Sequence, residues 1–243
     1  MSTLLRAGGA LGVALALCVP LQVQAQTPAP DATLFTVYSI SPDRTSVNWI
    51  VCGSTLVVIG CNGSSSLGTH LGTFGHVGAM LESAPVVSGN TATRQIYVLD
   101  TASGSGAMGV TLYVYTEVID EEMVMSATVT PTTSLSLPLT GGSSVIASMA
   151  ANNSYLFIGT NQDHEAVGVS KSTWATSTLR TYYPPTNVVA SITATSYGWV
   201  TITYATPGDA STAGNVIYDP DGNYWGGGSG VGFVVDTINA VVP

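Results

Sequence analysis

Three side chains that could exchange protons near neutral pH follow one another in a polar segment of the sequence. Asp163, His164 and Glu165 lie between two short apolar runs, residues 155–158 and 166–169. Imidazole and carboxylate groups gathered in this way could form a ligand-binding or acid–base site. The alternative, which we favour, is a solvated loop between two strands. His164 is retained as a candidate ligand-binding residue.

The other chemistry-bearing residues match no metal or nucleophile motif. His70 and His76 are six residues apart in a Gly-rich segment, and neither an HExxH segment nor a paired CxxC occurs in the sequence. Serines are numerous, but none lies in a GxSxG turn. We therefore expect no metal and no cofactor. Paired carboxylates for glycoside cleavage would meet in space rather than in sequence, so that alternative stays open.

Aromatic residues beside carboxylates are the main binding candidates. Residues 219–223 (DPDGN) resemble the start of a calcium loop but lack its closing glutamate, and Asp-Gly is a strong hairpin signal, so we expect a tight turn. Tyr224 and Trp225 follow directly. Rings on a loop beside Asp219 and Asp221 suit sugar binding, in which a ring stacks on the apolar face of a pyranose. Trp174, at a strand end, is a further candidate.

The elements that would position these residues repeat along the chain. Residues 147–172 and 190–221 each read as strand, turn, strand, and Ala147 and Ala190 lie 43 residues apart. An earlier unit, residues 47–60, fits the same pattern with a turn at Gly53 and Ser54. No stretch has apolar residues at helical spacing for two or more turns. The sequence therefore predicts an all-β chain.

Repetition favours one all-β architecture over another. A repeat of about 40 to 50 residues with several strands per unit is typical of a β-propeller, and we predict four or five blades. A β-sandwich is the alternative, because short, regularly spaced strands occur in both folds. In a propeller, residues 34–40 (LFTVYSI) and 231–235 (VGFVV) could pair to complete one blade.

These repeat units carry a loose family resemblance. The pattern resembles secreted β-propellers with short blades of the general Kelch or quinoprotein-repeat kind, and it is similar to exported bacterial proteins of this size. The Kelch double glycine with its spaced Tyr and Trp is absent from the matched units. The resemblance therefore implies a fold and carries no site residues to this chain.

Composition restricts the partners. Of 243 residues, 45% are hydrophobic and 8% charged, the net charge is −9, and Lys171 is the sole lysine. Such a chain repels phosphate backbones, because nucleic-acid affinity depends on lysine and arginine displacing counterions, so nucleic acid is not an expected partner. A glycan or a protein is the expected partner. Residues 32–243 have the size of one all-β domain.

The N-terminus predicts export. Residues 1–25 combine a positively charged start, an apolar run and small residues before Gln26, as a signal peptide does, and residues 26–31 form a Pro-containing linker. No later apolar run approaches the ~20 residues of a membrane span. We expect a secreted or periplasmic protein. Cys52 and Cys61 then favour one disulfide over two buried thiols, since that compartment is oxidising.

Three functions follow from these expectations. The first is an exported, non-enzymatic binding or interaction module, with carbohydrate as the leading ligand class. The second is a carbohydrate-active hydrolase or lyase. The third is a structural or adhesive surface component, to which the abundance of Ser, Thr and Gly also points.

Overall fold

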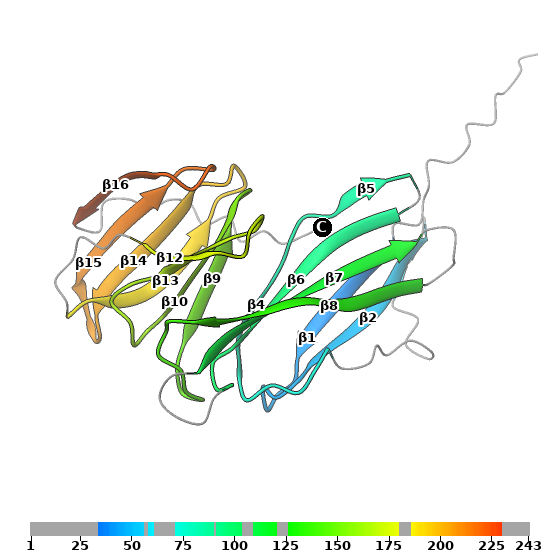
Figure 1. The fold of residues 1–243 in the computed structure, drawn as a ribbon, viewed down its shortest axis with the longest axis horizontal. Coiled ribbons are helices and arrows are strands. Elements are labelled where there is room, and N and C mark those ends of the chain that lie inside the picture. The colour runs from blue at the N-terminus through cyan, green and yellow to red at the C-terminus, as the bar shows by residue number, and fades with distance from the viewer. Residues whose placement is uncertain are drawn as a thin grey trace, which may run out of the picture. The chain divides into compact units, whose positions relative to one another are not determined.

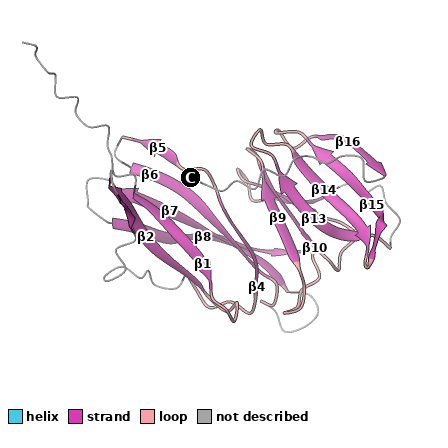
Figure 2. Cartoon of the chain, turned by 180° about the vertical axis from the view of Figure 1, so that it is seen from behind, coloured by secondary structure: helices cyan, strands magenta, loops and turns pink. Residues whose placement is uncertain are grey.

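The computed structural model describes residues 34–55, 58–60, 71–89, 91–103, 109–120, 126–179 and 186–229. Within these ranges the chain consists of strands joined by loops and turns, without a helix (Figure 2). Sixteen strands form four antiparallel sheets, and no sheet of the described part closes into a barrel. The prediction of an all-β chain is confirmed. The predicted signal peptide, the linker and residues 231–235 lie outside the described residues.

The first and second sheets come from the N-terminal half of the chain (Figure 1). The first has the order β1-β2-β3; the second has the order β4-β6-β7-β8, with β5 paired to β6. Their strands are β1 (Leu34–Ile40), β2 (Val47–Thr55), β3 (Val58–Gly60), β4 (Val77–Glu82), β5 (Val86–Ser88), β6 (Thr91–Asp100), β7 (Val110–Asp120) and β8 (Ser126–Leu137).

The third and fourth sheets are simple antiparallel meanders of four strands each. Ala147 and Ala190, which mark the sequence repeat, lie in the first strand of each meander, so the repeat corresponds to two sheets of the same strand order. Their strands are β9 (Ala147–Ala151), β10 (Tyr155–Thr160), β11 (Val167–Ser170), β12 (Thr176–Thr178), β13 (Val188–Ala194), β14 (Val200–Thr206), β15 (Asp209–Tyr218) and β16 (Tyr224–Ser229).

Three apolar cores lie between consecutive sheets. Alternate residues of a strand point to opposite faces, so one strand can supply two cores. In β10, Leu156 and Ile158 belong to the core shared with the second sheet, whereas Phe157 belongs to the core shared with the fourth. In β6, Tyr97 packs towards the third sheet and Ile96 towards the first. The inner sheets are therefore apolar on both faces.

The first strands of the last three sheets lie next to one another. β4 contacts β9, and β9 contacts β13. The Ser148 hydroxyl of β9 connects β9 to β13: it accepts from the Ile192 N–H at 2.8 Å and donates to the Ile192 carbonyl at 3.3 Å. At Gly78 of β4 an added Cβ would lie 3.1 Å from the Ala147 Cβ, so β4 and β9 approach closely. The unpaired edges of three sheets thus converge.

One predicted turn is wrong. Gly53 and Ser54 lie inside β2, where Gly53 is opposite Leu34 of β1 and Gly60 of β3. Pairing on both sides holds Gly53 extended, which overrides its local tendency to turn. Pro131 lies in β8, an outer strand of its sheet, beside a register shift, as is usual for proline in a sheet.

The contribution of one intersheet core can be measured by truncating Phe157. Its ring is buried between the third and fourth sheets, 5.2 Å from the ring of Tyr218. We expect Phe157→Ala to lower the free energy of unfolding by about 3–5 kcal/mol, since the cavity cannot collapse between two sheets. Urea denaturation measures the change. Tyr197→Ala, in an exposed turn, is the aromatic control and should cost under ~1 kcal/mol; equal losses would contradict this assignment of the core.

Candidate functional site

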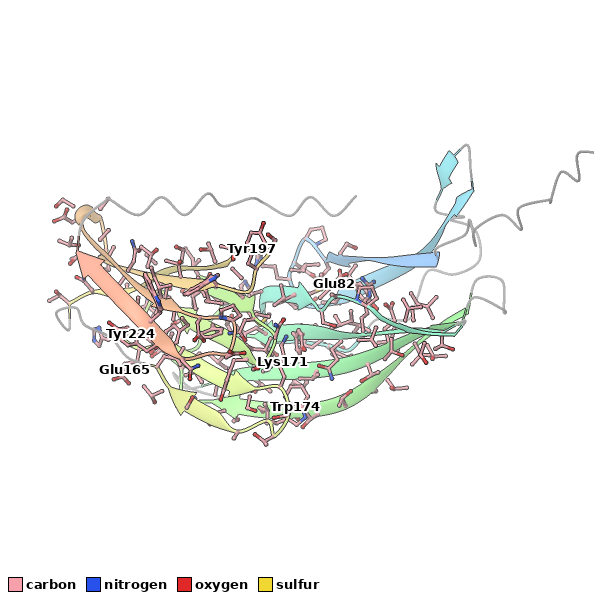
Figure 3. All side chains as sticks on the ribbon, turned by 90° about the horizontal axis from the view of Figure 1, so that it is seen from above. Glu82, Glu165, Lys171, Trp174, Tyr197 and Tyr224 are labelled. Atoms are coloured by element: carbon pink, nitrogen blue, oxygen red, sulfur yellow. The ribbon has the colours of Figure 1, made fainter. Side chains whose placement is uncertain are left out.

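A pocket of about 940 Å³ opens where the first strands of three sheets converge. Its wall contains the ends of β4, β9 and β13, part of β6, and the turns that follow these strands. Figure 3 shows Glu82, Lys171 and Tyr197, which come from three different sheets, around this region. The polar lining side chains are Glu82, Ser83, Thr93, Arg94, Gln95, Thr116, Asn152, Asn153, Lys171, Thr193, Thr195 and Ser196.

Glu82 belongs to a charge network at one wall of this pocket. Arg94 of β6 donates from Nη1 to Glu82 and from Nε to Glu117, and its guanidinium lies 5.4 Å from the centre of the Tyr38 ring. The Tyr38 hydroxyl donates to the second carboxylate oxygen of Glu117 at 2.7 Å. Glu117 is wholly buried, with 0% of its side chain exposed, whereas Glu82 is 32% exposed. Glu82 is thus the carboxylate of this network that reaches the pocket.

Burial raises the pKa of two groups in this network, Glu82 and Tyr38. Burial raises the pKa of Glu82 above its ordinary 4.5, the Arg94 charge opposes that shift, and the Glu117 charge adds to it. Burial also raises the pKa of Tyr38, and its hydrogen bond to Glu117 raises it further. Tyr38 therefore keeps its proton and remains a donor to Glu117 throughout the neutral range.

Lys171 lies on the third-sheet side of the pocket, in the turn after β11. Its Nζ donates to the Asn152 carbonyl at 2.6 Å, and its backbone N–H donates to the Ser154 carbonyl. Asn152 is itself fixed: its Oδ1 accepts from two backbone N–H groups of the turn, and its Nδ2 donates to the Asp219 carbonyl at 3.0 Å. Burial lowers the pKa of Lys171 below its ordinary 10.5. A cation is thus held at the pocket by a buried asparagine.

Tyr197 lies in the turn between β13 and β14, which borders the pocket, although Tyr197 itself is not among the residues that line it. The turn is closed by the Gly198 N–H, which donates to the Thr195 carbonyl at 3.0 Å, and Gly198 takes a φ of 83°, which favours glycine. Ser196 and Gly198, on either side of Tyr197, line the pocket. The Tyr197 side chain is 82% exposed, so its ring is available to a ligand.

The structure separates the residues that the sequence singled out. His164 lies before β11, at the opposite end of that strand from Lys171, and its Nδ1 is 2.9 Å from the Asn187 carbonyl oxygen. Figure 3 shows Glu165, the next residue, apart from Lys171. Trp174 packs against the core between the second and third sheets. Neither His164 nor Trp174 lines the pocket.

The aromatic residues of β16 also lie outside the pocket. Trp225 is 65% exposed and packs edge to face on Trp199 at 5.5 Å, and Tyr224 contacts the ring of Tyr218 at 6.2 Å. Asp219 closes the expected turn, because its Oδ1 accepts from the N–H groups of Asp221 and Asn223. Asp219 and Asp221 therefore belong to a structural turn.

The Asp219 carbonyl accepts from the pocket-lining Asn152. Asp221 is the second of these candidates near the new site. It lines a smaller hollow together with Lys171, Tyr155 and Asn153. Glu82, Lys171 and Tyr197 were missed by sequence reasoning. Lys171 had one available signal, its being the sole lysine of a strongly acidic chain; the other two had none, since a lone Glu and a turn Tyr are common surface residues.

The disulfide and metal expectations remain predictions. Cys52 lies in β2, but Cys61 is outside the described residues. Within the described ranges, three or more His, Cys, Asp or Glu side chains nowhere gather as metal ligands would. The same part of the structure has no helix of sufficient length and hydrophobicity to cross a membrane.

The chain matches no protein-family model, and no curated protein sequence matches it.

The buried charge network supplies a stability test. We expect Arg94→Gln to lower the free energy of unfolding by about 3–5 kcal/mol, because it leaves the Glu117 carboxylate buried without a cation. Glu82→Gln is the control; it should cost under ~1 kcal/mol, since that partner is partly solvated. Chemical denaturation at pH 7 measures both variants. A smaller loss for Arg94→Gln than for Glu82→Gln would show that Glu117 does not depend on Arg94.

Proposed function

We propose that this chain is an exported, non-enzymatic binding module whose ligand is a carbohydrate held in the pocket between the first strands. The observation that carries this proposal is the lining of the pocket by hydroxyl and amide side chains, together with the exposed ring of Tyr197 in a turn whose neighbouring residues line the pocket. A sugar offers an apolar face for stacking and hydroxyls for hydrogen bonds, so it matches both features.

The lining favours binding over hydrolysis. Carbohydrate hydrolases usually flank the scissile bond with two carboxylates. Of the described carboxylates, Glu82 lines this pocket, while Glu117 is buried behind Arg94 and Asp221 lines the smaller hollow. The hydrolase and the structural or adhesive component remain the alternatives. Concentration-dependent assembly in scattering experiments would favour the latter.

We further propose that the sheets are blades of a small β-propeller of the Kelch or quinoprotein-repeat kind. A ring of blades requires successive antiparallel sheets with adjacent first strands; the last three sheets have such first strands, and two of them are four-stranded meanders. The pocket at those strands would be the central channel. A sandwich would place two sheets face to face around one core, whereas consecutive sheets here share three. Residues 1–25 would direct export to the periplasm or beyond.

The ligand site can be tested with two exposed tyrosines. We expect Tyr197→Ala to weaken binding of the best ligand from a glycan array about tenfold, since a lost stacking contact costs about 1 kcal/mol or more. Tyr224→Ala, which removes an exposed ring outside the pocket, should change the affinity less than twofold. Titration calorimetry measures both. A larger loss of affinity in Tyr224→Ala than in Tyr197→Ala would place the site at Tyr224 and Trp225 instead. An array without any bound glycan would refute a carbohydrate ligand.

The propeller proposal has its own test in the C-terminal segment. β1 is an edge strand of its sheet, so one of its edges can accept the apolar residues 231–235. Deleting residues 230–243 should then lower Tm by several degrees, since a loss of about 1 kcal/mol shifts Tm by ~2–4 °C in a chain of this size. Scanning calorimetry measures the shift. An unchanged Tm would exclude a stabilising closure by this segment.

A further inference from the structure

We propose that the sugar bound in this pocket is acidic, and that its carboxylate pairs with Lys171. This inference rests on the proposed function and specifies its ligand class as a uronate-containing glycan. It is carried by the position of the one lysine of the chain: a half-buried ammonium at the pocket wall that forms no ion pair within the described residues.

The two cations of the pocket are used differently. Arg94 forms both ion pairs of the described part of the chain, one with Glu82 and one with Glu117. Lys171 donates to a neutral carbonyl, that of Asn152. An ammonium has three N–H donors, so two remain for a ligand. A charged group kept partly out of water without a counter-charge is costly, and a ligand carboxylate would offset that cost.

Hydrogen bonds hold the Lys171 ammonium in one position. The Asn152 carbonyl holds Nζ, and the Ser154 carbonyl holds the Lys171 backbone. Asn152 is fixed in turn by Asp219 of the fourth sheet and by its own turn. Binding therefore needs little further ordering of Lys171, and the neighbouring Asn153 amide can add a donor or an acceptor to the same ligand.

The surrounding charges favour a carboxylate on a sugar. Of the charged lining residues, Arg94 is shared between Glu82 and the buried Glu117, so Lys171 supplies the positive charge that forms no ion pair within the described residues. Glu82 is engaged by Arg94, and Asp221, in the smaller hollow, lies beyond 4.0 Å of Lys171. One positive charge matches one carboxylate. The hydroxyl and amide groups and Tyr197 favour a sugar over a peptide terminus as its carrier.

The test compares oligogalacturonate with the same oligomer after methyl esterification of its carboxyl groups. We expect the wild-type chain to bind the free acid at least tenfold more tightly than the ester. Lys171→Met should abolish this preference by weakening binding of the free acid much more than binding of the ester, and Lys171→Arg should retain part of it. Calorimetric titration gives the affinities, and thermal unfolding checks that each variant folds.

The outcomes separate this inference from the proposed function. Equal binding of acid and ester, with loss of both in Tyr197→Ala, would overturn the role of Lys171 and leave the carbohydrate module standing. If the chain bound a neutral glycan but neither oligomer, the role of Lys171 would also be overturned, and the carbohydrate module would again remain standing. Binding of an acidic peptide but of no glycan would overturn both.

A second readout does not depend on a variant. Selective incorporation of ¹³Cε-labelled lysine gives one side-chain resonance, because the chain has one lysine, and it reports the titration of Lys171 without removing any of its N–H donors. Free acid should raise the apparent pKa of Lys171, because a nearby carboxylate favours the ammonium, and the ester should leave that pKa unchanged. An apparent pKa of Lys171 that stays unchanged at saturating free acid would overturn the pairing.

Discussion

The constraint on which this structure depends is that its inner sheets are apolar on both faces. Alternate residues of one strand enter different cores, as Leu156 and Phe157 do in β10. Neither face can be left in water without losing the hydrophobic contribution of a whole layer, so each inner sheet needs a neighbour on both sides. Stability is then distributed over the interfaces between consecutive sheets, as in other repetitive proteins.

This packing also creates the pocket. When sheets of the same strand order pack in succession, their first strands come together, and their unpaired edges face one space. Side chains connect these edges, as the Ser148 hydroxyl does at Ile192. The turns at the ends of the first strands then border the pocket, which is why Asn152 and Ser196 lie there. Lys171 reaches it from the turn after β11, whereas Trp174, which follows the same strand, packs against a core.

The polar groups of the pocket are supported from behind by buried partners. Glu117 and Tyr38 fix Arg94, and Arg94 fixes Glu82; on the other side, Asn152 fixes Lys171. Glu82 and Lys171 are thus each held by a neighbouring residue that is itself fixed by further hydrogen bonds. Such support suits a binding surface, since little conformational freedom remains to be lost when the ligand arrives. The same arrangement explains how a chain with few charged residues concentrates several of them at one place.

The sequence by itself determined the all-β class, the Asp219 turn and the repeat that begins at Ala147 and Ala190. Alternation, turn residues and repetition are local or periodic signals. It misplaced the turn at Gly53, where pairing to two strands overrides local preference. Only the tertiary structure decided which polar residues share a site. Glu82, Lys171 and Tyr197 are each unremarkable in sequence, and His164, Trp174 and Trp225 looked more promising. Proximity between residues ~90 positions apart depends on how sheets pack, and no local pattern records that packing.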